Sequence, residues 1–245
     1  MPLRLLLLLS LFLPALASAQ GRPPSGEPAQ FRITTIDTRV RGAYYQPRGD
    51  RPRALRLSPS YIAGPYPFAP GAPLQIFRRE GEAPARLMAE ARIPAAVTQP
   101  LLLLLPVPAQ GPDETALPYA AVVIDDSLQA APLNTMRFIN LSDLPVVVAL
   151  GGMSPKRIDA RAQLVLPFAP PASGGGYQSL NIARQSPSGQ WERLTSAEEN
   201  EVYLEAGTRF LTIIRPTAAG STGGERVAPF AIIHDAHHIP PQPAS

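Results

Sequence analysis

The residues best suited to metal chemistry gather near the C-terminus, in the segment HDAHHIP. His234, His237 and His238, together with Asp235, offer imidazole and carboxylate groups of the kind that bind Zn²⁺, Cu²⁺ or Ni²⁺. Their spacing matches no helical HExxH motif, and the segment lies where an apolar run meets a proline-rich tail. We therefore expect tail histidines without a metal site, and we keep a metal-handling protein as an alternative.

Tyrosines are concentrated in the first half of the chain, where their rings could stack against sugars. Tyr44, Tyr45, Tyr61 and Tyr66 lie close together in the sequence and are the candidate ligand-binding residues. In a β-sandwich, roughly half of such side chains face the core instead. A carbohydrate-binding or adhesion module is therefore a second alternative. Trp191 is predicted to anchor a core in the second half.

Patterns typical of catalytic sites are missing from the chain. There is no cysteine and no Gly-x-Ser-x-Gly motif, which excludes thiol catalysis and leaves no nucleophile elbow. Asp125 and Asp126 are adjacent, so on a strand they point to opposite faces and cannot share a proton. The run Gly174–Gly176 precedes no helix that would make it a phosphate-binding loop. We expect a protein without enzymatic activity and without a cofactor.

The N-terminus carries the features of a secretory signal peptide. Arg4 precedes the apolar run Leu5–Leu13, and Ala17-Ser18-Ala19 is a small-x-small cleavage signal, so residues 1–19 are predicted to be removed after Ala19. Cleavage leaves no transmembrane anchor and predicts a periplasmic or secreted protein. Residues 20–30 are expected to be a disordered leader, and residues 237–245 a proline-rich tail.

Arginine dominates the basic residues, and Lys156 is the only lysine. This bias, with abundant alanine and proline, points to a GC-rich bacterial source. Eight arginines fall between Arg22 and Arg56. This region could contact anionic envelope polymers, but we favour a solvated linker. The net charge of +3 is small and includes Arg4, and no aromatic-interleaved basic motif is present, so nucleic acid is not an expected partner.

Short apolar or alternating segments bounded by proline and glycine recur along the chain, which is typical of β-sandwiches and barrels. The run Leu101–Leu105 is apolar at every position, so it is predicted to be a strand buried both by a facing sheet and by a neighbouring domain. Ser196–Glu205 is predicted to be a turn or a short helical excursion. The predicted strands are 31–37, 42–46, 53–58, 73–79, 85–94, 100–108 and 120–126, followed by 136–142, 145–150, 162–168, 178–184, 191–196, 209–216 and 230–235.

The second set of segments resembles the first. Residues 65–79 share Pro-Phe-Ala-Pro and Leu-x-Ile-x-Arg with residues 166–184, at offsets of about 100–110 residues. In the same order, LLLLPVPAQG matches FLTIIRPTAAG, and VVIDD (122–126) matches AIIHD (231–235). We predict an all-β protein of two tandem immunoglobulin-like β-sandwich domains, produced by internal duplication. One larger sandwich is the alternative.

The predicted domains are residues 31–127 and 128–236. The connection Ser127–Thr135 is short and contains Pro132, so the two domains should be held close together. The groove between them is where we expect function. The sequence thus favours an exported, non-enzymatic protein of the bacterial periplasm or cell envelope, with a binding or assembly role and an envelope protein or a glycan as its partner.

Overall fold

The computed structural model describes residues 28–36, 40–47, 51–79, 81, 84–107, 117–170, 172–196, 200–215 and 229–235. All regular elements in these ranges are β-strands, so the prediction of an all-β fold is confirmed. The predicted signal peptide, residues 20–27 of the leader, and His237 and His238 lie outside the described residues. No helix in the described ranges is long and apolar enough to cross a membrane.

The first half of the chain forms two four-stranded sheets that pack face to face, which we call the first sandwich. The strand orders are β4-β1-β7-β8 and β3-β2-β5-β6. Between the sheets, Phe31, Ile33, Tyr45 and Ile76 are fully buried. The strands are β1 Gln30–Thr35, β2 Ala43–Tyr45, β3 Arg53–Ala54, β4 Ala63–Pro67, β5 Leu74–Arg78, β6 Arg86–Ala91, β7 Pro100–Pro106 and β8 Tyr119–Asp125.

The second half forms a second sandwich. Its sheets have the orders β12-β9-β16-β17 and β11-β10-β13-β14, and β15 also pairs with β13. Met136, Phe138, Val148 and Leu180 lie in its core. The strands are β9 Thr135–Asn140, β10 Val146–Leu150, β11 Lys156–Ile158, β12 Gln163–Pro167, β13 Gly175–Gln185, β14 Trp191–Arg193, β15 Glu201–Glu205, β16 Arg209–Ile214 and β17 Phe230–Asp235.

The two sandwiches have the same strand order. β1 is antiparallel to β4 and parallel to β7, and β9 is likewise antiparallel to β12 and parallel to β16. Leu74 and Ile76 of β5 take the places that Leu180 and Ile182 take in β13, because Tyr45 lies opposite Ile76 as Val148 lies opposite Ile182. The Leu-x-Ile-x-Arg match between residues 65–79 and 166–184 aligns the same two pairs of residues. The chain therefore forms two sandwiches, not one larger one.

The immunoglobulin-like part of the prediction is not confirmed. In an immunoglobulin constant domain the first and second strands lie in one sheet with the fifth and fourth. Here β1 and β2 lie in opposite sheets, and β1 and β7 are parallel neighbours. The chain keeps the sandwich architecture and connects its strands in another order.

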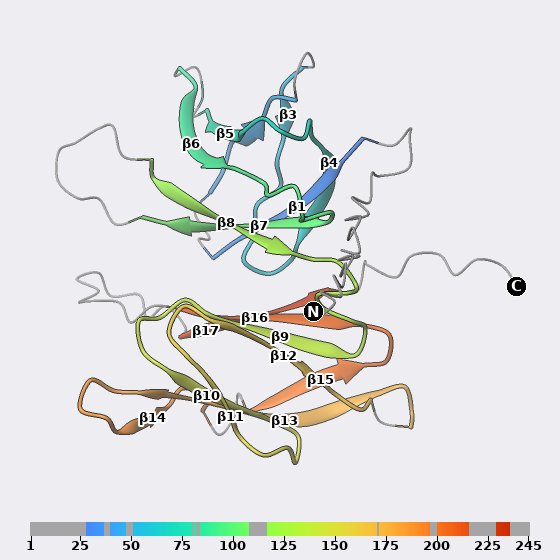
Figure 1. Ribbon diagram of the computed structural model, residues 1–245, viewed down its shortest axis with the longest axis vertical. Helices are drawn as coiled ribbons and strands as arrows, with labels where there is room; N and C mark the ends of the chain where they lie inside the picture. Colours follow the sequence, from blue (N-terminus) through green and yellow to red (C-terminus); the bar gives the residue numbers. More distant parts are fainter. Residues whose placement is uncertain are drawn as a thin grey trace, which may run out of the picture.

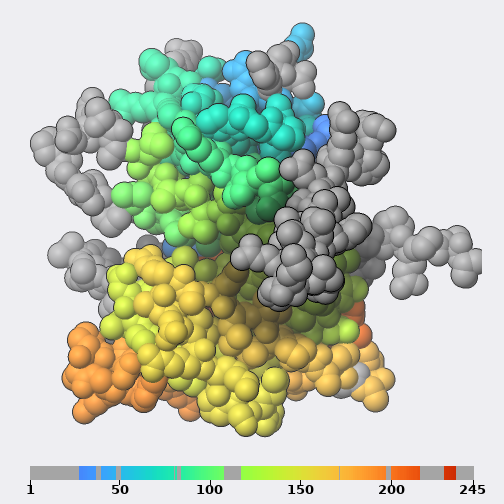
Figure 2. All heavy atoms as spheres, viewed as in Figure 1, coloured from blue at the N-terminus to red at the C-terminus, as the bar shows by residue number. Residues whose placement is uncertain are grey.

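The sandwiches stack on each other, so the molecule has four layers of sheet, with β4-β1-β7-β8 facing β12-β9-β16-β17 (Figure 1). Figure 2 shows the blue-to-green half lying directly against the yellow-to-orange half. A third hydrophobic core fills the contact. In β7, Leu102 and Leu104 point into the first sandwich, and Leu101 and Leu103 point into the contact. The prediction that this leucine run is buried on both faces is confirmed.

Three other predictions differ from the structure. The segment expected to be a turn or helical contains the strand β15, because Val202 and Leu204 alternate with exposed Tyr203 at the period of a strand. Trp191 is 46% exposed on β14 and anchors no core. Strands β11 and β4 were not predicted, the latter because Pro65 and Pro67 interrupt it. Strand β4 is an edge strand, where a residue without an N–H is tolerated.

Packing between the sandwiches can be tested at Ile213. This side chain is fully buried in the third core. Ile213→Val removes one methylene group, and we expect the free energy of unfolding to fall by about 0.5–1.5 kcal/mol. Urea denaturation followed by circular dichroism measures this. Leu128→Ala, at a turn position that is 37% exposed, is the control and should change stability by no more than about 0.5 kcal/mol. Equal effects of the two substitutions would contradict a packed interface.

Candidate functional site

Five charged side chains meet where the sandwiches touch, and we call them the interface network. They are Arg32, Asp126, Arg137, Arg209 and Asp235, and each residue is at most 9% exposed. Strand alternation positions the arginines: because Phe31 and Ile33 fill the first core, Arg32 points to the other face of β1, toward the second sandwich. Arg137 is placed in the same way on β9.

Arg32 joins the two sandwiches directly. Its Nη1 donates hydrogen bonds to Oδ2 of Asp126, at 2.7 Å, and to Oδ2 of Asp235, at 2.8 Å. Its Nη2 donates to Oδ1 of Asp235. Arg209 approaches from the other side, with Nη2 2.9 Å from Oδ2 of Asp235 and 3.3 Å from Oδ1 of Asp126. Two guanidinium groups thus share two carboxylates.

The network also holds the connection between the sandwiches. Arg209 Nη1 donates to the backbone carbonyl oxygens of Asp126, at 2.9 Å, and Ala131, at 3.1 Å. Arg137 Nη1 donates to the carbonyl oxygen of Asp125, at 2.6 Å. Arginines of the second sandwich thus donate hydrogen bonds to three backbone carbonyl oxygens at and after the end of β8. This fixes the path of the chain between β8 and β9.

Burial and charge act against each other within the network. Burial by itself raises the pKa of Asp235, but hydrogen bonding to Arg32, the charges of Arg32 and Arg209, and the hydrogen bond from Arg209 together hold that pKa below its usual range. Burial lowers the pKa of Arg137, and the charge of Arg209 adds to this, while Asp126 and Asp125 oppose it. The carboxylate of Asp235 is thus ionised and committed to two arginines.

A cavity of about 20 Å³ borders the network, lined by Asp126, Arg137, Arg209 and Asp235 with apolar neighbours. The Nε atoms of Arg137 and Arg209 are buried without a protein acceptor. A cavity of this size holds about one water molecule. It is too small for a substrate, so the interface network is suited to fixing the two sandwiches and not to transforming a ligand.

A larger pocket, which we call the outer pocket, lies on the first sandwich beside β2 and β5. Its volume is about 370 Å³, within the range that holds a small ligand. No lining residue carries a charge. The lining residues are Gln46, Pro47, Phe68, Ala69, Ala72, Pro73, Leu74, Gln75 and Phe77.

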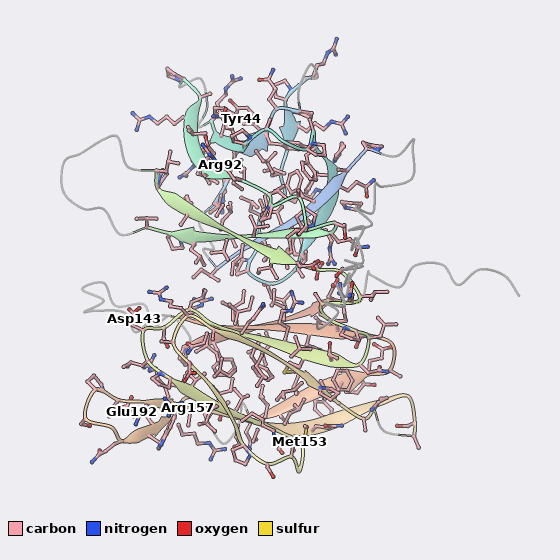
Figure 3. All side chains as sticks on the ribbon, viewed as in Figure 1. Tyr44, Arg92, Asp143, Met153, Arg157 and Glu192 are labelled. Atoms are coloured by element: carbon pink, nitrogen blue, oxygen red, sulfur yellow. The ribbon has the colours of Figure 1, made fainter. Side chains whose placement is uncertain are left out.

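An aromatic pair borders the outer pocket. Tyr44 lies opposite Phe77 across β2 and β5, and their rings stack with centroids 5.6 Å apart and planes at 22°. The guanidinium carbon of Arg79 lies 5.8 Å from the Tyr44 ring centre. Figure 3 shows Tyr44 on the sheet farthest from the second sandwich. Gln46 and Gln75 line the outer pocket together with Phe77, so two carboxamides accompany this ring.

The structure does not bring the four predicted tyrosines onto one surface. Tyr45 is fully buried and donates to the carbonyl oxygen of Pro67, at 2.9 Å. Tyr66 packs against Phe31, with ring centroids 5.5 Å apart. Tyr61 is 42% exposed in the loop before β4. Of the four, Tyr44 stands beside the outer pocket. Sequence reasoning did not identify Phe77, Gln46 and Gln75 as candidate binding residues. Pairing the predicted strands 42–46 and 73–79 would have indicated that they lie near Tyr44.

The histidine cluster is only partly described. His234 is exposed on β17, and its ring stacks on Phe210 with centroids 4.8 Å apart. Asp235 points the other way, into the interface network. Among the residues that the structure describes, no group of three or more His, Cys, Asp or Glu side chains is arranged to hold a metal ion. A metal site formed with His237 and His238 stays a prediction.

The described residues thus form a structural site, the interface network, and an open pocket, the outer pocket. In the interface network, the buried carboxylates of Asp126 and Asp235 are bonded to arginines. The outer pocket is lined by aromatic rings and side-chain amides. Comparison of the sequence with protein-family models and with curated proteins found no match.

Proposed function

We propose that this chain is an exported, non-enzymatic protein of the bacterial periplasm or cell envelope, in which two sandwiches related by internal duplication act as one rigid binding unit. The observation that carries the proposal is the interface network. Arg32 of the first sandwich and Asp235 of the second are buried and hydrogen-bonded to each other. Because separating or rotating the two bodies would leave these buried charges unpaired, such a pair favours one relative orientation.

Equivalent positions of the two sandwiches supply four of the five network residues, all but Arg209, which supports the duplication. Arg32 lies opposite Leu101 in β7, as Arg137 lies opposite Leu211 in β16. Asp126 and Asp235 each come two residues after the isoleucine paired with that leucine. The contact therefore resembles an isologous dimer interface, in which both partners use the same patch. One ancestral sandwich that paired with a second copy would produce this pattern after duplication.

A binding role follows from how the charged groups are used. The buried carboxylates of Asp126 and Asp235 each bond to arginine and so cannot act as general acids or bases. The outer pocket, by contrast, is open to solvent and uncharged. The signal-peptide features of residues 1–19 support export.

Fractionation and co-sedimentation test this proposal. We expect the exported protein to appear in the periplasmic or envelope fraction, shortened at its N-terminus by the length of the signal peptide. The purified protein should co-sediment with peptidoglycan sacculi or with outer-membrane vesicles, and serum albumin, as the control, should not. A cytoplasmic protein with residues 1–19 intact would contradict export, and a protein that stays in solution with every envelope fraction would contradict binding.

Carbohydrate binding or adhesion is the second candidate function. The observation that favours it is the outer pocket, where Tyr44 and Phe77 stack beside two glutamines.

A further inference from the structure

We infer that the outer pocket and the adjoining face of β2 and β5 bind a neutral saccharide, with Tyr44 and Phe77 as the stacking platform and Gln46 and Gln75 as hydrogen-bonding groups. This inference rests on the proposed binding function and names its ligand class. Tyr44 and Phe77 lie opposite each other on β2 and β5, Gln75 lies two residues before Phe77 on β5, and Gln46 directly follows the last residue of β2.

The aromatic pair is not required by the fold. The second sandwich pairs the equivalent strands in the same register, and there Val147 lies opposite Ala183 where the first sandwich has Tyr44 opposite Phe77. Next along the ladder, Ala149 faces Asn181. Small side chains thus suffice to cover this face of the sheet. Two aromatic rings on the half-exposed outer face of the first sandwich therefore call for a role other than packing.

The uncharged lining selects the class of ligand. No Asp, Glu, Lys or Arg lines the outer pocket, so its lining offers no counter-ion to a charged ligand. On the adjoining face, the guanidinium of Arg79 lies over the Tyr44 ring. The carboxamide nitrogen of Gln75 donates to Glu90, at 3.2 Å, which leaves its oxygen as an acceptor for a hydroxyl group. Gln46 is exposed, and its carboxamide carries both donor and acceptor groups.

Sugar rings match these groups. A pyranose presents a C–H face, which packs on aromatic rings and on apolar surfaces such as that of exposed Pro73, and a rim of hydroxyl groups, which amides bind. A polyproline segment also docks on aromatic surfaces. The paired carboxamides beside the rings favour the saccharide, because they match several hydroxyl groups at once.

Affinity electrophoresis tests the inference with the purified exported protein. The gels contain amylose, xylan or laminarin as neutral probes and alginate as a charged one, and a polyproline peptide is titrated separately. We expect at least one neutral polysaccharide to retard the protein, and Tyr44→Ala and Gln75→Ala each to raise its dissociation constant by about tenfold or more. Trp191→Ala, which removes an exposed aromatic ring from the second sandwich, should leave retardation unchanged.

The Gln75→Ala variant separates a loss of binding from a loss of folding, and it is compared with Tyr44→Ala. Gln75 is exposed, so Gln75→Ala should preserve the unfolding midpoint of the parent protein. No retardation by any neutral polysaccharide overturns the inference, as does retardation that persists in both variants. Tighter binding of alginate or of the polyproline peptide overturns it as well. If binding to envelope fractions survives these results, only the saccharide inference fails; if that binding is lost too, the proposed function fails with it.

Discussion

Arg32→Met is expected to lower the free energy of unfolding by about 3–5 kcal/mol, because it removes one partner of a buried ion pair. Methionine keeps much of the volume of the arginine stem but cannot donate to Asp126 or Asp235, which accept from Arg32 at 2.7 Å and 2.8 Å. Of the two arginines bonded to Asp235, Arg209 would remain, and Asp126 would lose its 2.7 Å contact. Desolvation of these carboxylates is no longer balanced, and the folded state loses stability.

Urea denaturation at pH 7, followed by far-ultraviolet circular dichroism, measures this effect. The matched control is Arg157→Met, which breaks an ion pair with Asp159 at 3.0 Å between side chains that are 58% and 76% exposed. Exposed pairs of this kind contribute about 0–1 kcal/mol. A loss for Arg32→Met no larger than that of the control would show that the interface network does not stabilise the stacked sandwiches.

The position of Arg32 shows where sequence reasoning reaches its limit. Eight arginines lie between Arg22 and Arg56, and their density favours a solvated linker. Arg32 is nonetheless 9% exposed, because Phe31 and Ile33 fix the direction of β1 and turn it toward the second sandwich. Local charge density carries no information about which face of a strand a second sandwich covers.

A signal for the network was nevertheless present in the sequence. The match of VVIDD with AIIHD pairs Asp126 with Asp235, and the structure brings these two carboxylates to one arginine. Strands could be predicted because burial leaves a strong apolar pattern, such as the continuous run Leu101–Leu105. Contacts between the two sandwiches could not, since their relative orientation depends on the three-dimensional stacking of the sheets.

The candidate binding site was predictable only in part. Tyr44 and Tyr45 are neighbours, so one must face the core and the other the solvent. Strand β2 has three residues, too few for alternation to decide between them. The pairing with β5 decides it, because Tyr45 lies opposite buried Ile76 and Tyr44 opposite half-buried Phe77.

Asp235→Asn is expected to cost about 3–5 kcal/mol at pH 7 and to change how stability depends on pH. The carboxylate of Asp235 accepts hydrogen bonds from both Arg32 and Arg209. A neutral amide in its place leaves these buried guanidinium groups with Asp126 as their remaining carboxylate. Exposed Asp159→Asn is the control, and it should cost no more than about 1 kcal/mol.

The pH dependence follows from the lowered pKa of Asp235 in the folded protein. A carboxyl group in the unfolded chain titrates near pH 3.9, so its stabilising contribution is complete above about that value and is lost as the pH falls through the lower folded pKa. Urea denaturation at several pH values between about 2 and 7 should therefore show the parent protein losing stability in acid more steeply than Asp235→Asn. The gap between the two should narrow as the pH falls, because a protonated carboxyl and an amide are both neutral. A gap that stays constant down to the lowest pH would mean that the charge of Asp235 contributes nothing to holding the sandwiches together.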